Sequence, residues 1–328
     1  MIVSRTPFRV SLVGGGSDLR QYYGVRPGSV VAMAIKRYMY VTVNRRFDST
    51  IRVSYTRTEI VDHAKQLQHE IIREAMNVVG LKGGIEITTI ADLPAGIGLA
   101  SSSTVTVGVL NALFAYIGRH VSAEELAQRA CEIEISILGK PIGKQDQYLA
   151  AYGGFQHVRF NPDESVQVNP IICSHEASRS LQKRLLLFYT GIQRSADSVL
   201  KDAKKRINGN GHVKATLDQM VWLSEELRCQ LLRNETTQVG QILARAWELK
   251  KHMASKVTNH VLDTYYRKAI TAGAEGGKVL GAGGGGCLLL HVQPRHQGKV
   301  RKVMHTAGLT EIPFAIEPEG SKIIYVGG

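Results

Sequence analysis

The 328-residue sequence has little cysteine, no long apolar run and a deficit of acidic residues. Its four cysteines are scattered and form no C-x-x-C pair, so neither a disulfide framework nor a zinc site is indicated. No apolar stretch approaches the ~20 residues that a membrane-spanning helix needs, and no charged-then-apolar leader follows Met1. We therefore expect a cytoplasmic protein with free thiols and no membrane partner.

The shortage of acidic residues leaves a strongly basic chain, with 41 Lys and Arg against 28 Asp and Glu and a formal net charge of +13. Such an excess suits nucleic-acid binding, and it also suits an enzyme that handles two phosphorylated ligands. The basic residues are spread along the chain, and the densest cluster, at 201–206, is short. We interpret that cluster as a solvated helix end rather than a binding patch.

A glycine-bearing loop between a predicted strand and a predicted helix is the most informative stretch. The β-branched run 85–90 predicts the strand, and the apolar spacing from Val105 to Tyr116 predicts the helix. The first amide groups of a helix have no intrahelical partner and lie at the positive end of its dipole, which makes an anion site. Gly96 and Gly98 allow close approach of the backbone to a phosphate, and the hydroxyls that follow can donate to phosphate or bind Mg²⁺. The alternative is a serine-capped helix after an ordinary turn.

This loop differs from the two familiar nucleotide-binding motifs. No lysine lies between Gly96 and Thr104, which excludes a Walker P-loop, and no third glycine stands at the Rossmann position. A later tract at 276–286 formally matches G-x-G-x-x-G, but a predicted strand follows where a helix is required. A polyglycine tract that enters a buried strand still implies close backbone approach, to a ligand or to another loop.

Two carboxylates are candidates for chemistry. A capping box at 122–125 starts a predicted helix that runs to Leu138, and Glu134 lies at the edge of its buried stripe. A carboxylate there needs a partner, and both a metal ion and a Lys or Arg stay open. Glu132 lies on the polar face and should be solvated. Asp146 comes near the start of a short helix, where an aspartate is most often a cap, the alternative being a catalytic base.

Three glycine-rich loops, near the start, middle and end of the chain, resemble those of the GHMP kinase family. They are the segments 7–18, 93–103 and 280–286, and their order and spacing agree with the family over essentially the whole chain. The first has Gly-Gly-Gly-Ser-Asp where galactokinases have Gly-Glu-His-Thr-Asp. The segments 132–134 and 143–147 are most similar to family members that act on a heptose 7-phosphate.

The resemblance implies a two-domain α+β fold with the active site in the cleft between the domains. An N-terminal α+β domain at 1–160 would contain a left-handed β-α-β unit, an exception to the usual handedness, and a ferredoxin-like domain would occupy 161–328. The implied reaction is transfer of the γ-phosphoryl group of ATP to the anomeric C1 hydroxyl of a heptose 7-phosphate. ATP and Mg²⁺ would be the cofactors and a sugar phosphate the partner, with no nucleic acid; a homodimer stays open.

The resemblance also implies roles for single residues. Asp146 matches the catalytic aspartate that accepts the proton of the attacking hydroxyl, and Arg9 matches the cation that steadies charge near the transferred group. Ser102 and Glu134 match the Mg²⁺ ligands. The implied nucleotide-binding residues are Pro94, Gly96, Gly98, Leu99, Ala100, Ser101, Ser102, Ser103 and Thr104. The implied substrate-binding residues are Gly15, Gly16, Ser17, Asp18, Gly283, Gly284 and Gly285.

Three other functions remain as alternatives. The chain could phosphorylate another sugar, such as fucose or galactose, or be a decarboxylase relative that acts on a phosphorylated mevalonate. A basic nucleic-acid-binding protein is the third, but it has no use for Asp146, Glu134 and Ser102 together.

A sugar 7-phosphate needs a second anion site, and the candidates for it are Arg20, Arg26, Lys36, Arg37 and Lys144.

Overall fold

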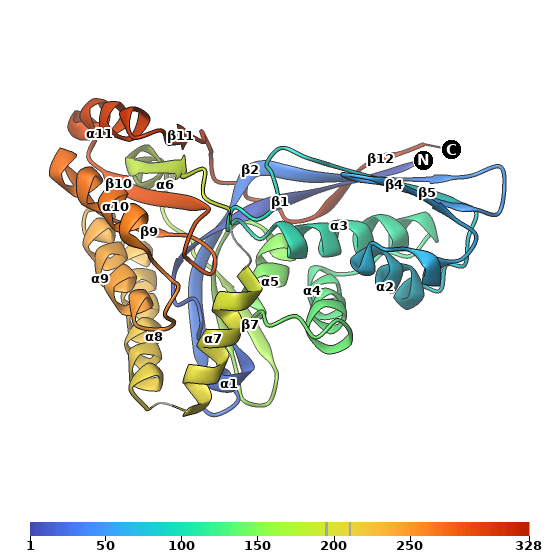
Figure 1. Cartoon of the computed structure of the whole chain (residues 1–328), viewed down its shortest axis with the longest axis horizontal. Coiled ribbons are helices and arrows are strands. Elements are labelled where there is room, and N and C mark those ends of the chain that lie inside the picture. Colours follow the sequence, from blue (N-terminus) through green and yellow to red (C-terminus); the bar gives the residue numbers. More distant parts are fainter. Residues whose placement is uncertain (194–195, 210, 328) are drawn as a thin grey trace.

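The computed structural model describes residues 1–193, 196–209 and 211–327, which form two antiparallel-rich sheets with helices packed against them (Figure 1). The larger sheet has eight strands in the order β12-β1-β2-β5-β3-β4, with β6 paired to β2 and β7 paired to β6. Of the pairs described, β3 with β5 is parallel and the others in this sheet are antiparallel. The strands are β1 (Ile2–Val13), β2 (Gly28–Arg45), β3 (Ile51–Ser54), β4 (Thr58–Val61), β5 (Ile85–Ala91), β6 (Phe155–Phe160), β7 (Val166–Pro170) and β12 (Lys322–Val326).

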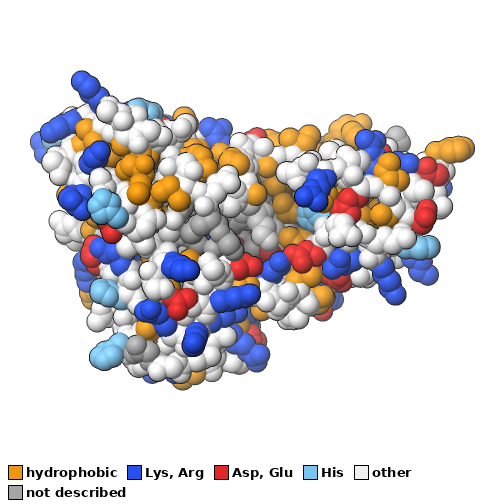
Figure 2. All heavy atoms as spheres, viewed as in Figure 1, with side chains coloured by type: hydrophobic (Ala, Val, Ile, Leu, Met, Phe, Trp, Pro, Cys, Tyr) orange, Lys and Arg blue, Asp and Glu red, His pale blue; other side chains and the backbone are white. Residues whose placement is uncertain are grey.

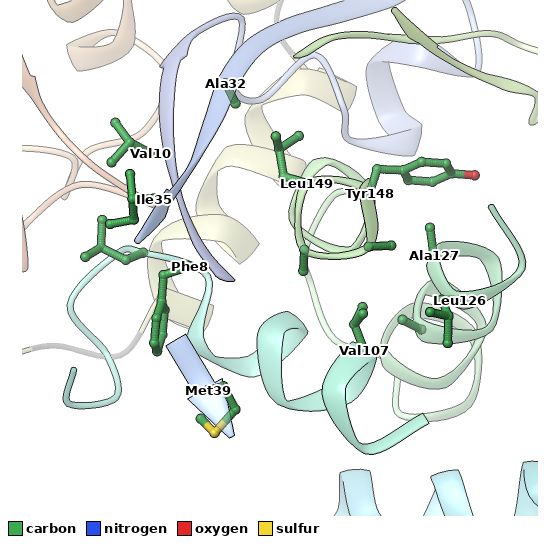
Figure 3. Close-up of a cluster of buried hydrophobic side chains, with 14 of the residues drawn as sticks. Phe8, Val10, Ala32, Ile35, Met39, Val107, Leu126, Ala127, Tyr148 and Leu149 are labelled. Carbon is green, nitrogen blue, oxygen red and sulfur yellow. The ribbon is translucent and has the colours of Figure 1, made fainter. Parts of the chain in front are cut away.

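Helices and two short turns accompany the larger sheet. They are α1 (Arg20–Tyr23), the 3-10 turn η1 (Ala64–Gln66), α2 (Glu70–Val79), α3 (Ser101–Tyr116), α4 (Ala123–Cys131), the π-helical turn η2 (Glu132–Ile137) and α5 (Gln145–Tyr152), α1 being a single turn. Helix α3 is apolar almost all round, so it lies in the interior against β1 and β2. Figure 3 shows part of this core, where Phe8 of β1 points toward Met39 of β2 and Val10 of β1 lies beside Ile35 of β2. Val107 of α3 belongs to the same core. This core holds the start of α3 and of α5 in place beside β1.

The smaller sheet has the order β11-β8-β10-β9, from β8 (Leu185–Tyr189), β9 (Ala274–Val279), β10 (Cys287–Val292) and β11 (Thr310–Glu311). Numbered along the chain, this order is 4-1-3-2, with helices after the first and the third strand, which is the ferredoxin-like arrangement. The helices in this part of the chain are α6 (His175–Arg184), α7 (Ala196–Gly209), α8 (Gly211–Leu232), α9 (Val239–Lys251), α10 (His260–Ala272) and α11 (Pro294–Thr306). Of these, α8 packs on β1 and β2 of the larger sheet. The expected α+β fold is therefore confirmed.

The expected domain boundary at 160 does not coincide with the division into sheets. Strand β7 follows that position and pairs with β6, and the terminal strand β12 returns to pair with β1. One apolar core also joins residues of both sheets, including Val41 of β2 and Leu289 of β10. The division into 1–160 and 161–328 thus stays a proposal. Among the described residues, no helix combines the length and the apolarity needed to cross a bilayer.

Candidate active site

One cavity of about 300 Å³ lies where the three glycine-rich loops meet. The sequence-predicted residues that line it are Arg9, Gly15, Gly16, Asp18, Gly96, Gly98, Ala100, Ser101, Ser102, Ser103, Asp146 and Gly285. The predicted residues outside the lining are Ser17, Pro94, Leu99, Thr104, Glu134, Gly283 and Gly284. Of these, Glu134 still reaches the site, because Ser102 Oγ donates a hydrogen bond to it.

Two of the other predicted residues form hydrogen bonds to the backbone of the glycine-rich loops. Ser17 Oγ donates to the Gly14 carbonyl at 2.8 Å, and Thr104 Oγ1 donates to the Ala100 carbonyl at 2.9 Å. Leu99 is fully buried, whereas Pro94 is exposed. These side chains shape the backbone that a ligand would touch, and their assignment to direct binding stays a prediction.

The third loop packs on the second loop. A Cβ built on Gly286 would lie 2.4 Å from the Ile97 carbonyl oxygen, and one on Gly281 would lie 2.6 Å from the Gly98 Cα. Only glycine permits this approach at these positions, which also have positive φ. The close approach expected for the polyglycine tract is therefore, at these two positions, to another loop.

Helix α3 begins without a side-chain cap. Its N-cap is Ala100, at a φ of 71°, and no side chain there bonds the first amides. The alternative of a serine-capped helix is therefore wrong, because the serines lie inside the first turn. Ser101 Oγ is buried and has no hydrogen-bond partner in the described part of the chain, although it lines the cavity. An anion at this helix start would find both free amides and a free hydroxyl.

Asp146 and Arg9 form a bidentate ion pair at the cavity wall. Arg9 Nε and Nη2 donate to the two Asp146 carboxylate oxygens at 2.7 and 2.8 Å, and Nη1 donates to the Gly98 carbonyl at 2.8 Å. The N-cap of α5 is Lys144, and Asp146 lies in the first turn, so the capping interpretation of Asp146 is wrong. The Asp146 side chain is 23% exposed, enough to meet a ligand, whereas Arg9 is buried. The carboxylate is thus oriented by a fixed cation and faces the cavity.

Glu134 is fully buried and bonded to neutral groups. Besides Ser102, Gln147 Nε2 donates to its carboxylate at 2.7 Å. Burial raises the pKa of Glu134, and the hydroxyl hydrogen bonds oppose that rise. Neither Lys nor Arg pairs with it in the described part of the chain, so the alternative of a rim ion pair is wrong. Glu132 is exposed and pairs with Arg129 at 2.9 Å, which confirms that it is solvated.

The helix that carries Glu134 is not the single α-helix expected from 123 to 138. Helix α4 ends at Cys131, and the π-helical turn η2 follows, closed by a Leu138 amide that donates to the Ile133 carbonyl at 2.9 Å. A π-turn widens the helix by one residue and often occurs at functional sites. It permits Ile133 and Glu134, neighbours in sequence, both to be buried.

The Glu134 environment fits a Mg²⁺ ion. A buried carboxylate with no cation next to it is electrostatically costly, and one carboxylate with one hydroxyl is an oxygen set that Mg²⁺ accepts when phosphates and water complete the shell. Ser102 and Glu134 would supply these protein oxygens. Among the described residues, no group of three or more acidic, His or Cys side chains could hold a metal ion by itself. Phosphate oxygens would therefore have to complete the Mg²⁺ shell.

Asp18 lines the cavity at the end of the first glycine-rich loop. Its carboxylate is buried and accepts from the Gly16 amide at 2.9 Å and from Gln145 Nε2 at 3.1 Å. Burial raises the pKa of Asp18, and the Asp146 charge adds to the rise. Gly143 is packed so tightly here that a Cβ would lie 2.0 Å from an Asp18 oxygen.

Three cavity lysines, Lys140, Lys250 and Lys278, were missed by sequence reasoning. Lys278 of β9 is buried and donates to the Leu12 carbonyl at 2.8 Å, and Lys250 of α9 donates to the Val279 and Gly281 carbonyls at 2.8 and 2.6 Å. Burial, with a smaller contribution from the Arg9 charge, lowers the pKa of Lys278 to about 7. The only signal that could have drawn attention to Lys278 was the presence of a lysine within the glycine-rich tract 276–286.

Lys278 is expected to make stability depend on pH. Between its folded pKa of about 7 and its ordinary value of 10.5, Lys278 is neutral in the folded chain and protonated in the unfolded one. Folding then releases a proton, so rising pH favours folding across this window, by about 1.4 kcal/mol per pH unit. As pH rises from 7.5 to 9.5, the free energy of unfolding of wild type should therefore increase relative to that of Lys278→Met. Both values would be measured by urea denaturation. Parallel pH profiles would contradict this expectation, and exposed Lys65→Met serves as the control.

Comparisons with known proteins agree with this geometry. The model of the GHMP kinases N terminal domain matches residues 58–154, and that of the GHMP kinases C terminal domain matches residues 228–308. The D-glycero-alpha-D-manno-heptose 7-phosphate kinase of Campylobacter jejuni is 30% identical, and the alignment covers 98% of each chain.

Solved structures are similar over the whole chain. A D-glycero-D-manno-heptose 1-phosphate kinase from Bacteroides thetaiotaomicron superimposes with a TM-score of 0.83 at 25% identity, covering all of both chains. A putative sugar kinase from Campylobacter jejuni superimposes with a TM-score of 0.80 at 28% identity, covering 98% of this chain and 97% of the other.

Proposed function

Because this chain belongs to the GHMP kinase family and is an ATP-dependent sugar kinase, we propose that its acceptor is D-glycero-D-manno-heptose 7-phosphate. The γ-phosphoryl group would pass to the anomeric C1 hydroxyl, giving the 1,7-bisphosphate for the synthesis of nucleotide-activated heptose. The main support for this substrate is the similarity to the heptose 7-phosphate kinase of Campylobacter jejuni, which extends over 98% of the chain. Mixed charge on the surface also favours a small-molecule ligand, since Lys and Arg side chains are interspersed with Asp and Glu on the face in Figure 2.

The catalytic roles proposed for the site follow from its geometry. The Asp146 carboxylate lies at the cavity wall, where it can accept the proton of the acceptor hydroxyl as the phosphoryl group is transferred. Arg9 holds that carboxylate in one orientation and leaves a fixed positive charge beside the transferred group. Phosphoryl transfer depends mainly on positioning and charge neutralisation, and both are supplied by residues already bonded in place.

The nucleotide phosphates are assigned to the start of α3. The amides that follow Ala100, with the hydroxyls of Ser101 and Ser102, face the cavity there. Mg²⁺, held by Ser102 and Glu134, would neutralise phosphate oxygens. Asp18 would accept hydrogen bonds from sugar hydroxyls on the other side of Asp146.

A second acceptor is favoured by one of the solved relatives. The Bacteroides thetaiotaomicron protein is described as a heptose 1-phosphate kinase. Transfer to the C7 hydroxyl of heptose 1-phosphate would give the same 1,7-bisphosphate from the opposite end. The two acceptors therefore must be compared directly.

An acceptor panel tests the proposal. ADP release with Mg-ATP would be measured for heptose 7-phosphate, heptose 1-phosphate, galactose, fucose and mevalonate, and the products would be followed by ³¹P NMR. A new anomeric phosphate formed from heptose 7-phosphate is the expected result. A new primary phosphate formed from heptose 1-phosphate would establish the second acceptor, and turnover of galactose or fucose alone would refute both.

A further inference from the structure

Helix α7 forms one wall of the cavity, and Lys204 of this helix lies next to the residues that line the cavity without being one of them. Leu200 and Ala203 line the cavity, and Lys204 lies one turn after Leu200 on the same face of the helix. The next turn anchors this part of α7, because Ile207 packs with Leu19 and other residues in a separate apolar cluster. Leu19 follows Asp18 directly, so Lys204 lies beside the loop that carries the predicted sugar-binding carboxylate.

The surroundings of Lys204 leave its charge available. Its side chain is half-buried, yet it forms no hydrogen bond or ion pair with the residues described at 1–193, 196–209 and 211–327. The opposite charge that acts on it is that of Asp18, while burial lowers the pKa of Lys204. The exposed neighbours Lys201 and Lys205 belong to the solvated surface, as expected for this cluster.

The other cations around the acceptor end are already engaged. Arg20 and Lys144 both pair with Glu164, and Arg26 pairs with Asp218 at 2.7 Å. Lys140, which lines the cavity, pairs with Glu70. Of the two remaining candidates for a second anion site, Arg37 donates to the Pro313 carbonyl at 2.5 Å, and Lys36 is exposed.

We propose that Lys204 binds the distal phosphate of the acceptor sugar. The groups then follow in a line, with the reacting hydroxyl at Asp146, the ring hydroxyls at Asp18 and the second phosphate at Lys204. The Asp146 charge acts on the Asp18 carboxylate, and the Asp18 charge acts on Lys204, which agrees with a central position for Asp18. This inference rests on the proposed function, since it requires an acceptor that already carries a phosphate.

The test compares a phosphorylated and an unphosphorylated acceptor. The ratio of kcat/KM for heptose 7-phosphate over free heptose would be measured for wild type, Lys204→Met, Lys204→Arg and Lys205→Met. A lysine that bonds a phosphate makes a charge-assisted contact, so Lys204→Met should lower the ratio at least ~10-fold, through KM for the phosphorylated acceptor. Lys204→Arg should restore most of it, and Lys205→Met should match wild type.

The two possible failures can be told apart. If wild type prefers heptose 7-phosphate and Lys204→Met retains the same ratio, the role of Lys204 is refuted and the proposed substrate stands. If wild type itself prefers free heptose, the proposed substrate is refuted, and the Lys204 inference falls with it. A drop in kcat/KM for both acceptors by the same factor would indicate a structural role for Lys204 and would also refute the inference.

Discussion

Replacing Asp146 with asparagine is expected to lower turnover at least ~100-fold while ATP affinity changes by no more than a few-fold. Asparagine has the same size and still accepts one hydrogen bond from Arg9, so the local geometry should survive. Asparagine cannot take up the proton of the acceptor hydroxyl. It also lacks the negative charge that pairs with the Arg9 guanidinium. Turnover would be measured by ADP release and nucleotide binding by calorimetry.

The control for this prediction is Asp62→Asn, which changes an exposed aspartate outside the cavity lining. Near-normal turnover of Asp146→Asn would remove Asp146 from the role of base. A loss of ATP binding that accounts for the whole loss of activity would assign Asp146 to the nucleotide instead.

Replacing Glu134 with glutamine is expected to raise the Mg²⁺ concentration needed for half-maximal activity at least ~10-fold, and Glu132→Gln is expected to leave it unchanged. The two residues stand two positions apart on the same π-helical turn, but Glu134 is buried against Ser102, whereas Glu132 is exposed and pairs with Arg129. They therefore form a matched pair in which only the environment differs. Ser102→Ala should shift the Mg²⁺ requirement in the same direction by a smaller factor.

A binding measurement separates the metal assignment from a general loss of activity. Mn²⁺ can serve as a spectroscopic probe, and its affinity in the presence of ATP should fall for Glu134→Gln but not for Glu132→Gln. Thermal unfolding of the variant is expected to show no loss of stability, because burial raises the pKa of Glu134 and glutamine removes a buried carboxylate at nearly constant volume. Equal Mn²⁺ affinity in both variants would contradict the ligand assignment.

The local features of the site could be predicted from the sequence because they depend on neighbours in the chain. The glycines at 96 and 98 and the run of hydroxyls that follows specify a tight loop before a helix wherever the helix is placed. The difference between Glu132 and Glu134 likewise follows from the spacing of apolar residues, even though the turn itself is π-helical.

The contacts that join these features were decided by the tertiary structure. Arg9 and Asp146 are separated by 137 positions and meet because β1 and α5 pack on the same core. The packing of the third loop on the second, the buried Lys278 and the half-buried Lys204 likewise depend on where the smaller sheet and α7 lie, which no local spacing records.

The sequence by itself thus determined which stretches can bind phosphate and which carboxylates are candidates for chemistry, since helix starts, glycine turns and apolar stripes are properties of short segments. Only the tertiary structure decided that Asp146 pairs with Arg9 instead of capping a helix, and that Lys278 is buried. The physical reason is that burial and ion pairing depend on distance in space, and packing of the two sheets brings distant segments within hydrogen-bond reach.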